Sequence, residues 1–372
     1  MTELILGTRK GLFVLEGEPS GPFEVRARAF AGETVDHARR DPRSGRIFAT
    51  VTSPFYGPKI FYTERPVSEW VQPSGSPSFP PEQAVPGWEQ ASGVELPRGG
   101  EAALKRIWVI EPGVQDGVVF AGGDPGVLFK SSDGGTSFEL NEALWNEPTR
   151  PGWQPGGGGL CLHSIVTWPG EPDRLAIGIS AAGVWLTDDG GKSWHQGNKG
   201  LKARYVPEEA PEDQIGLCVH RIHRPAARPQ RLFLQFHGGV YRSDDAGSSW
   251  TEIGDGLPSD FGFPLAVDPA DPDAAYVIPL TADLDRVTPG QRVRVYETRD
   301  AGSTWTARGD GLPAEHAYLT ILREAFDWTG SGESLGLYFG ATSGTVFGSA
   351  DAGAHWFTVA DRLPPVLSVT VS

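Results

Sequence analysis

The sequence has few cysteines and no long apolar run. Its 372 residues include two cysteines and one methionine. Cys161 and Cys218 occupy equivalent positions in two similar strings, which favours a pair of buried thiols in a reducing compartment over a disulfide. No window is apolar enough to span a bilayer. The stretch from Met1 to Gly7 lacks a signal-peptide pattern and has the pattern of a strand. We therefore expect a cytoplasmic protein without membrane contact.

Basic residues are also scarce relative to acidic ones. There are 32 Lys and Arg against 47 Asp and Glu, a net charge of −15. This charge argues against a nucleic-acid partner or an anionic membrane surface, because both require a basic face. A small-molecule or glycan substrate and a protein partner stay open. No amphipathic helical segment stands out, whereas 49 Gly and 32 Pro suit many short strands and turns.

What the sequence does have is a repeated eight-residue pattern, Ser/Thr-x-Asp-x-Gly-x-x-aromatic. Each copy follows a short apolar run, and successive Asp positions are 56, 56, 55 and 51 residues apart. Such a spacing means that each repeat is one supersecondary unit. An altered copy at 63–70 has Arg65 in place of the Asp. The five intact copies are 131–138, 187–194, 243–250, 298–305 and 349–356.

The pattern is that of a hairpin corner. The run before each copy alternates like a half-buried strand, as in Val184, Trp185 and Leu186. We expect the Asp to accept backbone hydrogen bonds, the Gly to adopt a positive φ, and the aromatic to begin the next strand facing inward. These Asp residues are thus predicted to be structural.

The pattern resembles the Asp-box, or bacterial neuraminidase repeat, of β-propellers. Over nearly its whole length the chain is similar to single-propeller bacterial proteins described as sialidase-like. Four further strings carry this similarity: 159–165, 216–222, 237–243 and 261–264. The Asp-box indicates a fold and not a reaction, because it occurs in sialidases, other glycosidases and non-enzymatic receptors.

We predict an all-β protein that is one domain over residues 1–372, a seven-bladed β-propeller. Residues 365–372 form a β-branched run without a blade of its own. We expect this C-terminal strand to pair with the N-terminal strands, close the ring and cover an exposed sheet edge. The predicted units are about 366–372 plus 1–30, 33–70, 106–145, 162–200, 219–258, 262–313 and 318–364.

The long connections are predicted to lie on one face. Turns with the repeated pattern are short and belong to the other face. Insertions concentrated on one face of a rigid scaffold usually carry binding or catalysis, although tolerated surface loops would give the same pattern. The long segments are 71–105, 146–161, 201–218 and 279–291.

Aligning the inner strands places polar residues at the mouth of a central channel on that face. Four come from the starts of inner strands: His37, Arg106, His163 and His220. The turns between second and third strands add Arg9, Lys10, Asp124, Ser180 and His237. Trp153 lies in a long segment, and Phe263 begins the sixth unit as a pocket wall or as packing between blades.

Three interpretations of this set stay open. His163, His220 and His237 are tentative ligands for one divalent metal ion, with Asp124 as an oxygen ligand or support. Alternatively, His163, His220, His237 and Asp124 are acid/base groups that act near neutral pH. In the third interpretation the histidines are satisfied polar residues that fill the channel. No cofactor other than the metal is expected.

Substrate contacts are predicted for a second group, with Arg106 as the anchor for an anionic substrate through bidentate contacts. This group consists of His37, Arg106, Arg9, Trp153 and Phe263. A carboxylate pair of the kind that glycosidases use is also left open. Its candidate members are Asp36, Glu101, Asp124 and Asp260.

The sialidase resemblance does not extend to the residues that carry out that reaction. Sialidases of this superfamily use an arginine triad, a Tyr–Glu nucleophile pair and an acid Asp. Here only Arg106 and Arg9 suit a triad, and no matching Tyr–Glu pair can be identified. We therefore expect a hydrolase or lyase for a small polar, sugar-like or anionic substrate, and not an exo-sialidase. The alternative is a non-catalytic scaffold that binds a protein or glycan through its long loops.

Overall fold

The computed structural model describes residues 1–64, 69–79, 103–204 and 216–372. These residues divide into two compact units, which are described separately. The first unit contains 1–38, 220–246 and 250–372, and the second contains 39–219 and 247–249. Arg65, Glu101, the acidic run 208–213 and most of the segments 71–105 and 201–218 lie outside the described residues.

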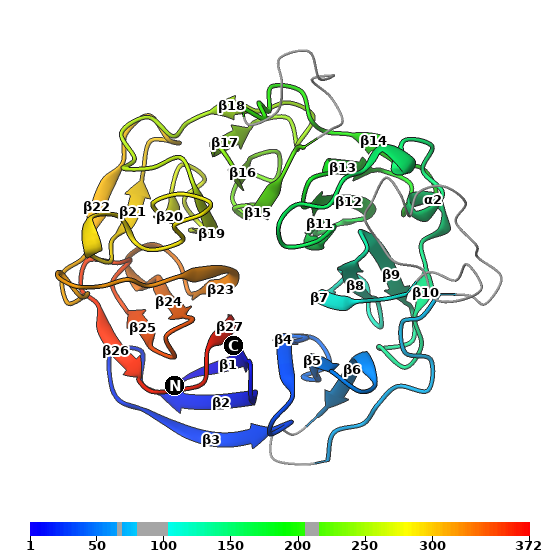
Figure 1. Cartoon of the computed structure of the whole chain (residues 1–372), viewed down its shortest axis with the longest axis horizontal. Helices are drawn as coiled ribbons and strands as arrows, with labels where there is room; N and C mark the ends of the chain where they lie inside the picture. Colours follow the sequence, from blue (N-terminus) through cyan, green and yellow to red (C-terminus); the bar gives the residue numbers. More distant parts are fainter. Residues whose placement is uncertain (65–68, 80–102, 205–215) are drawn as a thin grey trace. The chain divides into compact units, whose positions relative to one another are not determined.

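The largest sheet belongs to the first unit. It has eight strands in the order β26-β25-β24-β23-β27-β1-β2-β3 (Figure 1). In chain order these strands are β1 (Thr2–Thr8), β2 (Gly11–Gly17), β3 (Phe23–Ala29), β23 (Ile321–Thr329), β24 (Gly336–Ala341), β25 (Val346–Ser349), β26 (Phe357–Ala360) and β27 (Val366–Val371). A 3-10 helix, η3 (Gly332–Ser334), precedes β24.

The C-terminal strand pairs with the N-terminal strand, as the sequence predicted. β27 runs antiparallel to β1, with Leu6 opposite Val369, and parallel to β23, with Glu324 opposite Ser368. The side chains of Val366 and Val369 are buried on this strand. β27 therefore has hydrogen-bonded neighbours on both sides, so it leaves no open edge.

Two further sheets complete the first unit. One is β15 (Val219–His223), β16 (Leu232–Phe236), β17 (Gly239–Ser243) and β18 (Thr251–Glu252). The other is β19 (Gly262–Val267), β20 (Ala275–Pro279), β21 (Val295–Thr298) and β22 (Thr306–Arg308), with η2 (Pro289–Gln291) between β20 and β21. The chain passes from the second unit to the first within β15.

The second unit holds two four-stranded sheets and most of a three-stranded one. One four-stranded sheet consists of β7 (Arg106–Pro112), β8 (Val119–Asp124), β9 (Val127–Ser131) and β10 (Glu139–Leu140). The other consists of β11 (Leu162–Trp168), β12 (Glu171–Ile179), β13 (Gly183–Thr187) and β14 (His195–Gln196). The third is β4 (Thr34–Arg40), β5 (Ile47–Ser53) and β6 (Gly57–Thr63). The helices are α2 (Glu142–Trp145) and η1 (Arg150–Gly152).

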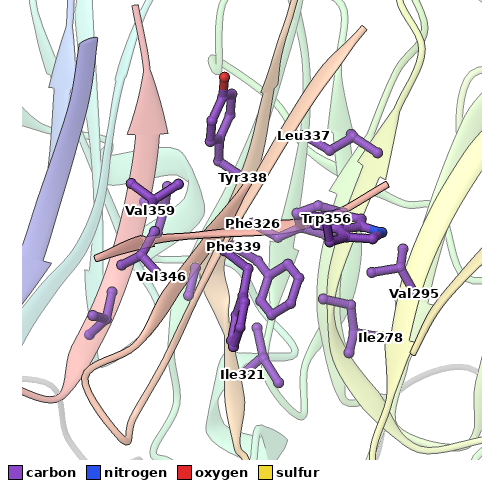
Figure 2. Close-up of a cluster of buried hydrophobic side chains, with 14 of the residues drawn as sticks. Ile278, Val295, Ile321, Phe326, Leu337, Tyr338, Phe339, Val346, Trp356 and Val359 are labelled. Atoms are coloured by element: carbon purple, nitrogen blue, oxygen red, sulfur yellow. The ribbon is translucent and has the colours of Figure 1, made fainter. Parts of the chain in front are cut away.

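Apolar runs form these strands because most of them are covered on both faces. All six residues of β24 are buried, and so are all five of β13. Figure 2 shows one result in the first unit, a cluster that includes Phe326, Phe339 and Trp356. The rings of Phe339 and Trp356 lie 5.2 Å apart in an edge-on arrangement. Such clusters supply the apolar burial that stabilises short strands.

The repeated corners have the geometry that the sequence predicted. In the fourth corner, Asp300 Oδ1 accepts from the backbone N of Thr304 at 2.8 Å, and Oδ2 accepts from its hydroxyl at 2.7 Å. Thr298 Oγ1 donates to Asp300 and accepts from the backbone N of Gly302, whose φ is +91°. Trp305 Nε1 donates to the carbonyl of Ile253 at 2.7 Å. The structural role of this Asp is confirmed.

None of the helices in the described part of the chain is long and apolar enough to cross a membrane. Both cysteines are buried and neither forms a disulfide, as expected.

Candidate functional site

One cluster of chemically active side chains lies within the first unit. We call it the His237 cluster. Its residues come from the start of β15, the β16–β17 turn, the start of β19, the loop between β20 and β21, and β23. They are His220, His237, Phe261, Phe263, Asp283, Arg286 and Arg323.

His220 forms the buried base of this cluster. Its ring centroid lies 4.7 Å from that of Phe263, 5.5 Å from Phe261 and 5.4 Å from His237. Nδ1 is 2.5 Å from the carbonyl oxygen of Gly262. Because a carbonyl only accepts, Nδ1 is the protonated nitrogen of the neutral ring, and Nε2 carries the lone pair. This tautomer suits a base or a metal ligand.

His237 is partly exposed above this base. Its Nε2 lies 3.9 Å from Oδ2 of Asp283. Burial lowers the pKa of His237, and the positive charges of Arg286 and Arg323 lower it further, although Asp283 opposes them. His237 is therefore neutral at pH 7, the state that a general base or a metal ligand requires.

Two guanidinium groups approach the same aromatic ring. The Cζ atoms of Arg323 and Arg286 lie 4.7 Å and 5.3 Å from the centroid of Phe263. Arg286 also pairs with Asp283, at 2.7 Å between Nη2 and Oδ1. Arg323 is buried, whereas the side chains of Arg286 and Asp283 are 42% and 43% exposed. Guanidinium groups bind carboxylate and phosphate through paired hydrogen bonds, so the cluster is suited to an anion.

The loop that carries Asp283 and Arg286 is held by its own hydrogen bonds. It belongs to the predicted long segment 279–291. The backbone N of Thr281 donates to the carbonyl of Val287 at 2.8 Å, and Thr320 Oγ1 donates to the carbonyl of Arg286 at 2.6 Å. The sequence analysis missed Asp283, Arg286 and Arg323. The only available signal was that two of them lie in a long segment.

Two of the predicted metal ligands lie close together. Within the first unit, the ring centroids of His220 and His237 lie 5.4 Å apart. Imidazole nitrogens are ligands that suit zinc. Sequence analysis named both of these histidines.

His163, the third predicted metal ligand, has structural contacts on both ring nitrogens. Nε2 lies 2.8 Å from the carbonyl oxygen of Val219, and Nδ1 lies 3.1 Å from Ser164 Oγ. The side chain is fully buried in β11 of the second unit. Since Nε2 must donate to the carbonyl, only Nδ1 has a lone pair, and it faces a hydroxyl. These contacts favour the interpretation of His163 as a satisfied buried residue.

Asp124 is a buried carboxyl of the second unit. It ends β8 opposite Arg106 in the β7–β8 pairing. Burial raises its pKa to about 6, although Lys105 and Arg106 oppose the shift. Its Oδ2 lies against Gly159, close enough that a Cβ at that position would collide with it. A buried carboxyl with this pKa can exchange a proton near neutral pH. Arg106 itself stacks on Trp108, 4.6 Å from its centroid.

Trp153, a predicted substrate contact, is buried in the second unit. Its side chain is 1% exposed and its ring lies 5.3 Å from that of Trp185. Between Trp153 and Trp145 lies Arg150, also 1% exposed, which donates to the carbonyls of Pro125 and Gly126. Trp153 thus packs around an arginine that holds the turn after Asp124. Sequence analysis missed Arg150 because a buried arginine is rare.

The remaining predicted residues have diverse surroundings. Arg9 and Lys10 are exposed in the β1–β2 turn, and the backbone N of Arg9 donates to Pro365. His37 is buried in β4. Ser180 is buried and donates to Val219, and Phe263 is 2% exposed. Within the first unit, His220, His237 and Phe263 are therefore the predicted residues that the structure brings together.

No protein-family model matches the chain, and no curated protein matches it. Solved structures do. A candidate 6-phosphogluconolactonase from Bacteroides fragilis superposes with a TM-score of 0.58 at 8% identity, covering 100% of this chain and 98% of that one. An ancestral GH74 enzyme gives 0.56 at 16% identity, and the GH74 xyloglucanase of Xanthomonas campestris gives 0.54 at 16%.

These matches cover much of this chain but only part of the GH74 chains. The ancestral enzyme is matched over 91% of this chain and 38% of its own length, and the xyloglucanase over 87% and 45%. The chain therefore spans less than half of either GH74 structure. At such low identity the likeness shows the fold alone, which is a β-propeller.

Proposed function

We propose that this protein is a hydrolase for a small, anionic, sugar-like substrate bound at the His237 cluster. The observation that carries the proposal is a neutral imidazole 3.9 Å from a carboxylate, beside two guanidinium groups that share one aromatic ring. The imidazole and carboxylate suit proton transfer, and the two guanidinium groups suit the binding of an anion. A lyase reaction uses the same groups, because it also begins with proton abstraction.

In this proposal each side chain has a distinct task. His237 takes a proton from the attacking water, and Asp283 stabilises the resulting imidazolium. Arg286 and Arg323 bind the anionic group and so fix the substrate next to the base. Phe261 and Phe263 are buried and pack against the rings of His237 and His220, respectively. His220 supports the ring of His237 from below.

Asp124 is a second proposed acid/base group, on the basis of its raised pKa. Arg106, Arg9 and His37 stay proposed substrate contacts, with Arg106 as an anchor. We propose only a structural role for His163, because both of its ring nitrogens are in hydrogen-bond contacts.

A divalent metal is the alternative to a general-base role for His237, because a neutral imidazole has only one lone pair. His220 and His237 would hold it, and it would supply an activated water or polarise the substrate. The residues fit, because Nε2 of His220 carries the lone pair when Nδ1 donates to Gly262. Metal analysis of the purified protein tests this part: one equivalent of zinc is expected, and His220→Ala should lose it.

For the architecture we propose seven blades in one domain, with β27 closing the ring. The repeat spacing and the pairing of β27 with β1 support this. The His237 cluster would then lie at the mouth of the central channel. A cytoplasmic location and the absence of nucleic-acid or membrane partners stay proposals that rest on the net charge and on two cysteines that form no disulfide.

The substrate class is proposed from the site and from the likeness to propellers that act on sugars. The candidate lactonase and the GH74 enzymes differ in reaction, so a panel of substrates is required. We would assay 6-phosphogluconolactone, a xyloglucan oligosaccharide and a sialic acid glycoside. Turnover of the phosphorylated lactone is expected, and the sialic acid glycoside should be inert.

The decisive variant is His237→Gln, with His195→Gln as the control. His195 is exposed in β14 of the second unit, outside the His237 cluster. Loss of a general base typically costs about 10²–10⁴-fold in rate, so we expect a fall of that size in kcat for His237→Gln and none for the control. Unchanged turnover in His237→Gln would overturn the proposal. Tight glycan or protein binding without any turnover would instead favour the scaffold alternative.

A further inference from the structure

A second group of buried polar side chains lies on the inner strands of the first unit. It consists of Glu324 on β23, Ser368 on β27 and Arg221 on β15, and we call it the Glu324 cluster. Glu324 and Ser368 are opposite each other in the parallel β23–β27 pairing. Their exposed fractions are 4% and 0%, and that of Arg221 is 7%.

Two oxygens of this cluster lack a hydrogen bond from any of the residues that the structure describes. They are Oε1 of Glu324 and Oγ of Ser368. Arg221 Nη1 is 3.9 Å from Glu324 Oε1, close enough for an ion pair but too far for a hydrogen bond. A Cβ on Gly7 would collide with Ser368 Oγ, so the backbone of β1 closes one side.

Buried polar atoms in native proteins are nearly always hydrogen-bonded, because leaving one unpaired costs free energy. Here a carboxyl oxygen and a hydroxyl on adjacent strands both have no hydrogen-bond partner among the described residues. Burial raises the pKa of Glu324 to about 7, while Arg221 and Arg323 oppose the shift and Asp36 adds to it. A neutral group that donates a hydrogen bond to this carboxyl would therefore stabilise it.

The Glu324 cluster is connected to the His237 cluster through β23. Arg323 precedes Glu324 in the chain, and its guanidinium belongs to the His237 cluster. Arg323 also lies close enough to Glu324 to influence its pKa. The two clusters therefore meet at consecutive residues of β23.

A sugar hydroxyl meets the requirements of both partners. It can donate to Glu324 Oε1 and accept from the guanidinium of Arg221, whereas a second anion would be repelled by Glu324 and Asp36. We infer that Glu324, Arg221 and Ser368 bind the hydroxyl groups of a polyol chain whose anionic end lies at Arg286 and Arg323. The inference rests on the proposed function, which it makes more specific: the substrate is a phosphorylated or carboxylated polyol.

The test compares two probes on the full-length protein by calorimetry: inorganic phosphate and 6-phosphogluconate. The wild type should bind 6-phosphogluconate at least about tenfold more tightly than phosphate, because the hydroxyl groups add hydrogen bonds. Glu324→Gln keeps the shape of the side chain but places an amide at the acceptor. It should weaken 6-phosphogluconate about tenfold and leave phosphate binding unchanged. Ser368→Ala should give a smaller loss with the same selectivity.

Glu297→Gln is the matched control, because Glu297 is also buried but is paired with Arg299 and Arg308. It should alter neither affinity. If Glu324→Gln does not fold, Ser368→Ala carries the test. Equal affinity of the wild type for both probes would overturn the polyol inference and leave the anion site standing. A wild type that binds neither probe would refute the proposed function itself. Unchanged 6-phosphogluconate binding in the folded variants would overturn the inference alone.

Discussion

The carboxylates of the repeated corners and those of the candidate sites have opposite surroundings. In the second corner Asp189 accepts hydrogen bonds from the backbone and hydroxyl of Ser193, and these hydrogen bonds lower its pKa. Asp124 and Glu324 are buried, and burial raises their pKa values to about 6 and about 7. The same functional group is thus held as an anion in one region and able to exchange a proton in the other.

This contrast separates structural from functional carboxylates by one criterion. A corner Asp accepts hydrogen bonds at both carboxylate oxygens from donors of its own eight residues. Glu324 retains a buried acceptor that none of the described residues fills. Four predictions test this division.

The largest effect is expected from Gly302→Ala in the fourth corner. Gly302 has φ +91°, and a Cβ there would meet Cβ of Ile253 at 2.5 Å. The left-handed conformation and overpacking against a core side chain together should cost about 3–4 kcal/mol. The free energy of unfolding from denaturant titration measures this. A loss below about 1 kcal/mol, which is typical of an average substitution, would show that the corner is not rigid.

Gly159→Ala is the matched change at a candidate site. Its φ is +102°, but the close contact is with the carboxylate of Asp124, the end of a side chain that can rotate. The loss of stability should therefore be smaller than for Gly302→Ala, whereas the proton exchange of Asp124 should change.

The second effect is the pH dependence that Asp124 imparts. Burial raises its folded pKa from 3.8 to about 6. The native state thus binds the proton more tightly than the unfolded state, and the free energy of unfolding falls as pH rises from about 4 to about 6. Asp124→Asn removes this fall. It should gain about 2–3 kcal/mol relative to the wild type between pH 4 and pH 7, measured by urea titration at both values.

The control for this experiment is Asp300→Asn, a corner residue with the opposite shift. Hydrogen bonds from Thr304 lower the pKa of Asp300. Its titration is therefore complete below this interval, and the difference between the variant and the wild type should not grow between pH 4 and pH 7. An Asp124→Asn variant that gains no stability relative to the wild type over the interval would contradict the assignment of Asp124.

The third effect is the loss of a corner carboxylate. Asp300→Ala removes the acceptor for the backbone N and hydroxyl of Thr304 and for the hydroxyl of Thr298. The backbone N–H of Thr304 then forms a hydrogen bond with water instead. The loss of stability should therefore be measurable by urea titration but smaller than for Gly302→Ala. Ligand affinity should stay unchanged, because the corner takes no part in binding. Calorimetry with 6-phosphogluconate checks this. A change in affinity of about tenfold, or 1.4 kcal/mol, would contradict a purely structural role for the corner carboxylate.

Much of the fold could be predicted from the sequence, because its signals are local. The corner pattern places a turn, a positive φ and an inward aromatic within eight residues, and β-branched residues near the C-terminus predict β27. The candidate site was harder. His220 and His237 were identifiable by their place at strand starts and turns. Asp283 and Arg323 are 46 and 86 residues from His237 along the chain, so only the folded structure brings them to it.

The smallest effect is expected from Asp133→Asn in the first corner. Hydrogen bonds from Ser137 lower the pKa of Asp133 to about 2. Its stabilising contribution is therefore complete above the unfolded value of 3.8 and is lost as pH falls through about 2. Because the side chain is exposed, solvent screening limits this contribution to less than about 1 kcal/mol at pH 7. Urea titrations should show a small deficit for the variant at pH 7 that disappears toward pH 2. A deficit that persists at pH 2 would mean that the shape of the side chain, and not its charge, stabilises the corner.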